Sequence, residues 1–362
     1  MRTPRHLAPR IVAAVTALIA VGALASCSRA AEDTTAAPAA TSPATQLRLA
    51  YFPNITHAPA LIGVAKGYFT QELGSTKLTT QTFNAGGDEI AALLGGSIDA
   101  GFIGSSPAIN GFAKSDGKDV RLIAGSTSGG AQLVVSPDIT SPAQLKGKII
   151  ATPQKGNTQD VSLKKWLKQN NLPQGTGPDA VTVQNLDNPR TLDLFKTGQI
   201  SGGWLPEPWS SQLVAAGAKV LVDEKSLWPN GLFPTTVLIV RTQYLQEHPD
   251  TITALLRGEQ KAVDFADSDP ADAKTVTNDA IKQLTHATLP SAVLDRAFSE
   301  LSFTLDPLAA EFPQLSKDSV TAGVTTTETD LKGFVDLAPL NSVLQATGKP
   351  AVDAAGLDKV QG

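Results

Sequence analysis

The chain has 362 residues, 41% of them hydrophobic, a formal net charge of −4 at neutral pH and one cysteine. The acidic balance argues against a nucleic-acid partner, which requires a basic face, and a lone cysteine excludes an internal disulfide. The length suffices for two lobes of ordinary domain size.

Residues 1–26 have the pattern of a secretory signal. Arg2, Arg5 and Arg10 form a basic head, and the apolar run after them is shorter than the roughly 17–25 residues of a membrane span. Small residues then lead into Cys27, which resembles the lipobox of bacterial lipoproteins, where the cysteine becomes the lipidated first residue. The alternatives are an uncleaved anchor or an incidental cysteine. Cleavage removes three arginines and lowers the formal charge from −4 to −7.

Residues 27–46 are small and polar and contain no core former, which predicts a flexible tether. Strands and helices then alternate, as expected for a sheet with helices on both faces. Asp88 is expected to cap one helix. The sequence predicts strands over 46–52, 77–84, 120–125 and 132–136, a helix over 59–66 that ends at Gly67, and a helix leading into Gly96.

A second alternation begins near Lys148 and resembles the first in its order. From Pro249 onward, apolar residues recur near helical spacing, which predicts helices that complete the first lobe and brace a hinge. The predicted elements of the second run are strands over 148–152, 181–184 and 219–222 and helices over 158–168 and 190–196.

Two apolar segments of similar character, 132–136 and 236–241, are interpreted as the crossings between two lobes. Lobe 1 is therefore expected to be discontinuous. It comprises 47–133 and 238–362, and lobe 2 comprises 134–237.

Two stretches of the chain echo one another at an offset of 102 residues, 93–108 and 194–210. Each predicts a helix that ends at a glycine suited to the left-handed conformation, then a short strand, then a turn into a helix with proline in its first turn. Ligands of open α/β sheets bind beyond the carboxyl ends of such strands. The echo indicates two similar lobes facing one cleft, and the alternative is chance similarity between two ordinary α/β units. The offset pairs Gly96 with Gly198 and Phe102 with Trp204, and the prolines of the two first turns are Pro107 and Pro208.

Enzyme signatures are missing from the sequence. It contains no G-x-S-x-G elbow, no P-loop, no G-x-G-x-x-G after a strand and no H-E-x-x-H. The four histidines are scattered, so no metal site, cofactor or catalytic triad is predicted.

Helix starts that follow strands recur instead, and they carry small hydrogen-bonding residues. Unpaired backbone N–H groups and the helix dipole make such starts suitable for anions. Each one is also an ordinary cap, so only convergence in space separates a cap from a ligand site. The four candidates are 54–57, 105–106, 125–130 and 155–159.

Glu207 lies between two prolines at the position that matches Ser105. Three roles remain open for its carboxylate: accepting from a ligand hydroxyl or ammonium, capping its own helix, or forming an ion pair across the cleft. Trp209 is interpreted as either a flat pocket wall or a core residue, and Trp228 as either a cleft rim or core. Trp166 and Trp204 are expected in the core.

Four segments together resemble the nitrate/sulfonate/taurine-type solute-binding proteins of bacterial ABC importers. They are L-R-L-A-Y-F-P-N-I-T-H-A-P-A-L, L-L-G-G-S-I-D-A-G-F-I-G, S-P-A-Q-L-K-G-K-I-I-A-T-P-Q-K-G-N-T and G-W-L-P-E-P-W, and the likeness covers about 47–245. The resemblance implies a type II periplasmic-binding-protein fold of class α/β, with a mixed sheet flanked by helices in each of two lobes and a hinge of two crossing strands. Ser201 departs from the pattern, since Asp99 of the first copy and the family have aspartate, at a position expected to lie away from the pocket.

The resemblance implies a lipid-anchored binding subunit on the extracytoplasmic face of the cell membrane, monomeric and not an enzyme, serving a permease and an ATPase. Its ligand would be a small organic anion, an aliphatic sulfonate first, with nitrate or bicarbonate, taurine or a thiamine pyrimidine precursor as alternatives. A same-fold enzyme of pyrimidine synthesis and a surface receptor or adhesion lipoprotein are the competing functions. The implied ligand contacts are Asn54, His57, Ser105, Ser106, Asn157, Thr158, Gln159, Glu207 and Trp209.

Overall fold

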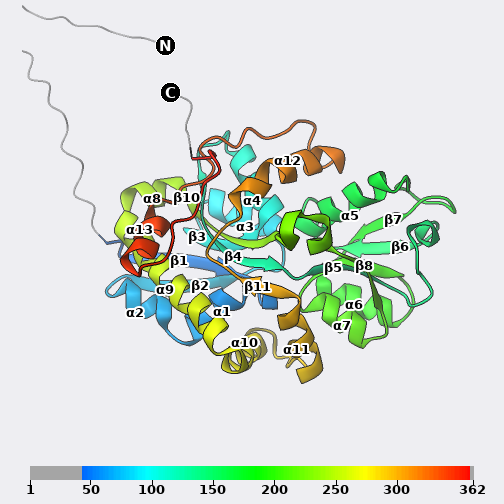
Figure 1. Cartoon of the computed structure of the whole chain (residues 1–362), viewed down its shortest axis with the longest axis horizontal. Coiled ribbons are helices and arrows are strands. Elements are labelled where there is room, and N and C mark those ends of the chain that lie inside the picture. Colours follow the sequence, from blue (N-terminus) through cyan, green and yellow to red (C-terminus); the bar gives the residue numbers. More distant parts are fainter. Residues whose placement is uncertain (1–42, 359–362) are drawn as a thin grey trace, which may run out of the picture. The chain divides into compact units, whose positions relative to one another are not determined.

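The computed structural model describes residues 43–358. The predicted signal over 1–26, the predicted lipidation site at Cys27 and the predicted tether as far as residue 42 lie outside the described residues. Two mixed β-sheets flanked by helices make up the described part (Figure 1).

The first sheet has six strands in the order β11-β4-β10-β3-β1-β2. Strand β1 is parallel to both β2 and β3, whereas β10 is antiparallel to β3 and β4, and β11 is antiparallel to β4. The strands are β1 (Gln46–Tyr51), β2 (Lys77–Thr82), β3 (Ala100–Gly104), β4 (Val120–Gly129), β10 (Pro234–Arg241) and β11 (Leu301–Phe303).

The second sheet has five strands in the order β7-β6-β8-β5-β9. Strand β6 is parallel to β7 and β8, and β5 is antiparallel to β8 and β9. This repeats the pattern of β2-β1-β3-β10-β4, so the two halves of the sequence echo occupy equivalent places in the two sheets. The strands are β5 (Ala131–Val135), β6 (Ile149–Thr152), β7 (Thr182–Asn185), β8 (Gly202–Pro206) and β9 (Lys219–Asp223).

Alternation along the strands of the second sheet builds a core on each of its faces. Leu133 and Trp204 pack with residues of α5, whereas the next residues, Val134 and Leu205, pack with residues of α6 and α7. Figure 1 accordingly shows α5 on one side of this sheet and α6 and α7 on the other. The helices are α5 (Thr158–Gln169), α6 (Asn188–Lys196) and α7 (Trp209–Ala215).

The remaining helices surround the first sheet, and one continuous core joins them to it. Helix α12 also contacts α5, and α11 contacts α7, so the C-terminal part of the chain packs against both sheets' helices. These helices are α1 (Ala58–Ala65), α2 (Tyr68–Leu73), α3 (Gly86–Leu94), α4 (Ser105–Lys114), α8 (Thr242–Glu247), α9 (Pro249–Ser268), α10 (Pro270–Thr285), α11 (Ser291–Ser299), α12 (Phe312–Thr321) and α13 (Ala338–Ala346).

Two sequence expectations need correction. Asp88 does not cap α3, because that helix already begins at Gly86 after Ala85, which places Asp88 inside the first turn. The connections between the sheets lie beside the predicted crossing segments, since the chain passes from β4 to β5 at Gly130 and from β9 to β10 through 224–233. The lobe boundaries predicted at 133/134 and 237/238 stay a prediction.

Candidate functional site

The two echoed turns begin alike. Gly96 and Gly198 have φ of 71° and 70°, the left-handed conformation that glycine adopts at low cost. Strand β3 then runs directly into α4 at Ser105, whereas β8 is followed by Glu207 and Pro208 before α7 begins. Pro208 therefore precedes its helix as the N-cap residue and is not in the first turn, contrary to the sequence expectation.

A polar cavity of about 400 Å3, open solvent included, lies where these turns meet. Side-chain amides, hydroxyls and one imidazole from both sheets surround it, and no charged side chain is among the residues that line it. The lining residues are Phe52, Asn54, Thr56, His57, Asn84, Gly86, Gly104, Pro107, Pro153, Asn157, Thr158, Gln159, Asn188, Pro206, Thr235 and Thr236.

Five of the nine predicted contacts line this cavity. Asn54 and Asn157 occupy N-cap positions, yet neither side chain makes a cap hydrogen bond. The Asn157 amide and Asn54 Nδ2 are therefore available to the cavity, whereas Asn54 Oδ1 accepts from Trp209 Nε1 at 2.9 Å. This favours the ligand-site interpretation over the cap interpretation at these two positions. The five are Asn54, His57, Asn157, Thr158 and Gln159.

His57 enters the cavity wall as an uncharged donor. Its ring is buried and stacks on Phe52 with the ring centroids 4.5 Å apart. Burial lowers the pKa of the imidazole to about 3, and Nδ1 accepts a 3.3 Å hydrogen bond from the Phe52 backbone N–H. The proton of the neutral ring is thereby assigned to Nε2, which is left to donate.

Ser105 and Ser106 do not line the cavity, although both are buried and both hydroxyls lack a hydrogen-bond partner. The Ser106 backbone N–H donates to Thr158 Oγ1 at 3.3 Å, which joins the start of α4 to the start of α5. The candidate stretch 125–130 also lies outside the cavity, mostly as the end of β4.

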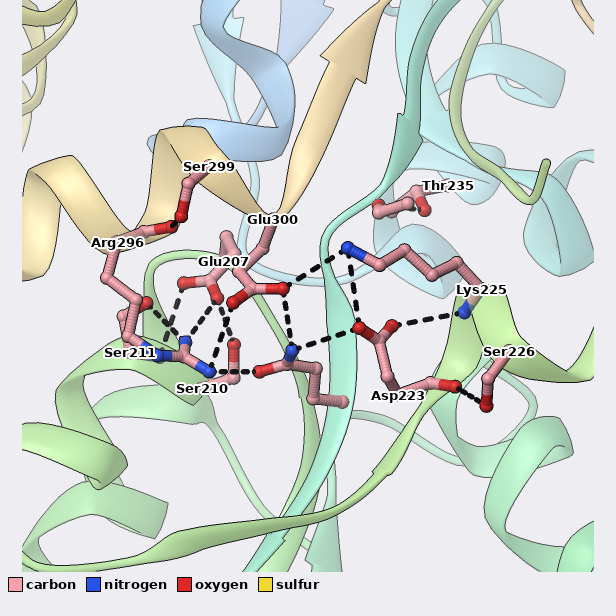
Figure 2. A network of polar contacts seen from close by, with 12 residues as sticks. Glu207, Ser210, Ser211, Asp223, Lys225, Ser226, Thr235, Arg296, Ser299 and Glu300 are labelled. Carbon is pink, nitrogen blue, oxygen red and sulfur yellow. Dashed lines mark hydrogen bonds and ion pairs between the residues drawn. The ribbon is translucent and has the colours of Figure 1, made fainter. Parts of the chain in front are cut away.

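Glu207 is fully buried beside the cavity and is not part of its lining. Its Oε1 accepts from Ser210 Oγ at 2.6 Å and from Arg296 Nη1 at 3.0 Å, and Oε2 accepts from the Ser211 backbone N–H at 3.2 Å (Figure 2). Burial nevertheless raises the pKa of this carboxyl above its usual value. In the structure, Glu207 both caps its own helix and forms an ion pair, two of the three roles left open by the sequence.

Arg296, the ion-pair partner of Glu207, was not predicted from the sequence. It comes from α11 and also contacts Ser211, Gln132 and Glu300, so that a polar network extends from Glu207 toward β5 and β9 (Figure 2). The spacing of Arg296 and Glu300, one helical turn apart, was the only local signal.

The structure also places the tryptophans. Trp166 and Trp204 are buried and pack edge to face, which confirms the core prediction. Trp228 is buried as well, and its Nε1 donates to Glu224 at 3.1 Å, so it is core and not rim. Trp209 is half-buried, and its Nε1 donates to Asn54 Oδ1 at 2.9 Å, which links α7 to the loop after β1.

The cavity residues missed from the sequence are mainly Asn84, Asn188 and the hydroxyls of β10. Asn188 begins α6 and carries the same signal that identified Asn157. Asn84 ends the segment predicted as a strand, which is where ligand contacts of α/β sheets lie. Asp99, by contrast, is paired with Arg48 and Arg241 away from the cavity, as expected for that position.

Among residues 43–358 no group of three or more histidine, cysteine, aspartate or glutamate side chains is arranged to hold a metal ion. Within the same part of the chain, no helix combines the length and the apolar character needed to cross a bilayer.

A model of the NMT1-like family matches residues 40–280. The chain is 29% identical to the taurine-binding periplasmic protein of Escherichia coli strain K12 over 202 residues, which are 55% of this chain. The matched region spans 60% of the length of that relative. The predicted resemblance is confirmed at the level of the family.

Two solved structures share the fold. The alkanesulfonate-binding protein SsuA from Xanthomonas axonopodis pv. citri, bound to MOPS, matches with a TM-score of 0.65 at 21% identity, over 82% of this chain and 100% of that one. The periplasmic nitrate-binding protein NrtA from Synechocystis PCC 6803 matches with a TM-score of 0.69 at 16% identity, over 85% and 90%. The predicted periplasmic-binding-protein fold, with two helix-flanked sheets, is confirmed.

Proposed function

Because the chain belongs to the NMT1-like family, we propose that it is the solute-binding subunit of an ABC importer and that it holds an aliphatic sulfonate between its two sheets. The observation that carries this proposal is the cavity itself. Residues from both sheets line it, and its polar side chains are all uncharged.

Uncharged donors suit an oxyanion that must be bound and later released. A sulfonate presents three acceptor oxygens, and the cavity offers the amides of Asn157 and Gln159, the Thr158 hydroxyl and His57 Nε2. Thr158 also begins the twelve-residue helix α5, whose N-terminal dipole favours negative charge. Together these donors can replace the hydrogen bonds that the sulfonate makes to water, and no cationic side chain is needed to balance its charge.

The lining chemistry favours an alkanesulfonate over taurine, an aminoethanesulfonate that carries an ammonium group as well. A buried ammonium requires a carboxylate or several acceptors. No carboxylate is among the residues that line the cavity, and the buried carboxylate of Glu207 is paired with Arg296 at 3.0 Å. Relatives that bind taurine, alkanesulfonates or nitrate delimit the ligand class for this proposal.

A thermal-shift panel tests the ligand class. Methanesulfonate, ethanesulfonate, taurine, nitrate, bicarbonate and an aminopyrimidine are added separately to the purified protein. A ligand that binds the folded state raises Tm. At a ligand concentration of 100 times Kd, it adds about 2.7 kcal/mol to the free energy of unfolding. The alkanesulfonates are therefore expected to give the largest shifts in Tm. Thr158→Ala should reduce them. Equal or larger shifts with nitrate alone, or no shift with any sulfonate, would contradict the assignment, and turnover of a ligand would favour the enzyme alternative.

We also propose that a lipid on Cys27 holds the protein at the extracytoplasmic face of the membrane, with the permease and ATPase subunits as its partners. Cys27→Ala should release the protein from sedimented membranes, because no acyl chain remains to anchor it. The unaltered chain serves as the control. Tight membrane association of the variant would instead indicate an uncleaved signal.

A further inference from the structure

A second cavity, of about 870 Å3 with open solvent included, adjoins the polar one. The two cavities share Asn54, Asn84 and Asn188. Beyond these asparagines the character of the wall changes, because the second cavity is lined by Phe83, the Trp209 ring and two aliphatic side chains of the C-terminal region, Ile281 and Leu289.

The apolar wall is held in place by its own contacts. Leu289 lies between α10 and α11, where its backbone N–H donates to Asn278 Oδ1 at 3.0 Å and its carbonyl accepts from Asn278 Nδ2 at 3.1 Å. Ile281 belongs to α10 itself. Both side chains are buried, 4% and 8% exposed for Ile281 and Leu289 respectively, so the wall is formed before any ligand arrives.

The junction between the cavities carries polar groups with room for a partner. Trp209 Nε1 donates to Asn54 Oδ1 at 2.9 Å, whereas the buried Oδ1 of Asn188 has no hydrogen-bond partner among the described residues. A molecule that extends from the polar cavity into the apolar one passes these amides.

We propose that the second cavity receives an apolar tail of the ligand, an alkyl chain or aromatic ring longer than two carbons, while the anionic head stays in the polar cavity. The inference rests on the proposed function, since it assigns the tail of the same ligand. A tail buried against Phe83, Ile281 and Leu289 leaves water, and this transfer is favourable in proportion to its apolar area. Nitrate, bicarbonate and taurine have no such tail.

A chain-length series on the full-length protein tests the assignment. Methane-, butane-, hexane- and octanesulfonate are titrated by calorimetry, with 1-hexanol and 1-octanol as tails that lack the anion. Each methylene that enters the cavity should tighten binding about fourfold until the cavity is filled. The alcohols should bind far more weakly than the sulfonates of equal length.

Variants locate the tail. Leu289→Gln and Thr288→Trp are expected to abolish the gain from chain length while methanesulfonate binds as before. The first makes the wall polar, and the second blocks the cavity from an exposed position where folding is not at stake. Leu284→Gln is the control for the change from leucine to glutamine, because Leu284 lies on α10, the helix that carries Ile281, is 40% exposed and is not part of the lining.

The outcomes separate the two proposals. If methanesulfonate binds and longer chains bind no more tightly, the tail site is overturned and the proposed function stands. If no sulfonate of any length binds, both are overturned. An equal loss in Leu284→Gln and Leu289→Gln would also overturn the tail site, because the effect would not depend on the cavity.

Discussion

Glu207, which lies between two prolines, uses its carboxylate for contacts within the protein and not for lining the polar cavity. Its carboxylate is fully buried and is satisfied by Ser210, Ser211 and the Arg296 guanidinium. Burial still raises its pKa, so the charged form is held at a cost that the arginine offsets. The pair also joins α7 to α11, two helices from distant parts of the sequence.

Arg296→Met is expected to lower the free energy of unfolding by about 3 kcal/mol at pH 8, because it leaves a buried carboxylate without its cation. Without the arginine, the pKa of the Glu207 carboxyl in the folded variant lies further above its value in the unfolded chain than it does in the unaltered protein. A group with a raised folded pKa favours the folded state less as pH rises, so the loss should shrink at pH 5. Urea denaturation at the two pH values measures both quantities.

The control for this pair is Glu207→Gln in the Arg296→Met background, which removes the stranded charge and should recover part of the loss and flatten its pH dependence. If Arg296→Met loses the same stability at pH 5 and pH 8, the effect comes from packing and not from the carboxylate. The arginine stem covers apolar surface in either case.

At the scale of elements, the parts that local sequence determines were predicted well. The glycine, strand and helix of the echoed segments follow from backbone conformation and short-range periodicity, and Gly96 and Gly198 occupy the expected left-handed positions. Asp88 failed as a cap because two glycines, Gly86 and Gly87, extend the helix start before it. An acidic residue inside the first turn suits the helix dipole equally well, so composition alone does not fix the first residue.

The residues of the site also differ in whether local sequence predicts them. Asn54, Asn157 and Thr158 were predicted because each lies at a strand-to-helix junction, which the sequence reveals locally. Arg296 and Leu289 were not predicted, since α11 and the loop before it are placed beside the site by packing between segments far apart in the sequence; Arg296 and Glu207 are 89 residues apart. No periodicity or cap distinguishes a helix that braces a hinge from one that walls a cavity.

For the whole molecule, contacts between the two sheets gather around the polar cavity. Gln154 Oε1 accepts from the Gly87 backbone N–H at 3.0 Å, and Asn110 Nδ2 donates to the Gly156 carbonyl at 3.2 Å. The chain itself passes between the sheets only at Gly130 and through 224–233 within the described residues. Such an arrangement suits two lobes that separate and close about these connections, with the ligand favouring the closed form.

Gln154→Ala tests this closure, because Gln154 bonds across the sheets without lining the cavity. If the sheets separate without ligand, only the closed form loses this hydrogen bond and the longer one, 3.5 Å, that Gln154 Nε2 donates to Asp88 Oδ1. The shorter bond contributes about 1 kcal/mol net, so the Kd for methanesulfonate should rise roughly fivefold or more while Tm of the free protein stays unchanged. Gln199→Ala, which removes a bond within the second lobe to Thr197, should leave the Kd as it was. A lower Tm of the free protein with an unchanged Kd would mean that the sheets do not separate.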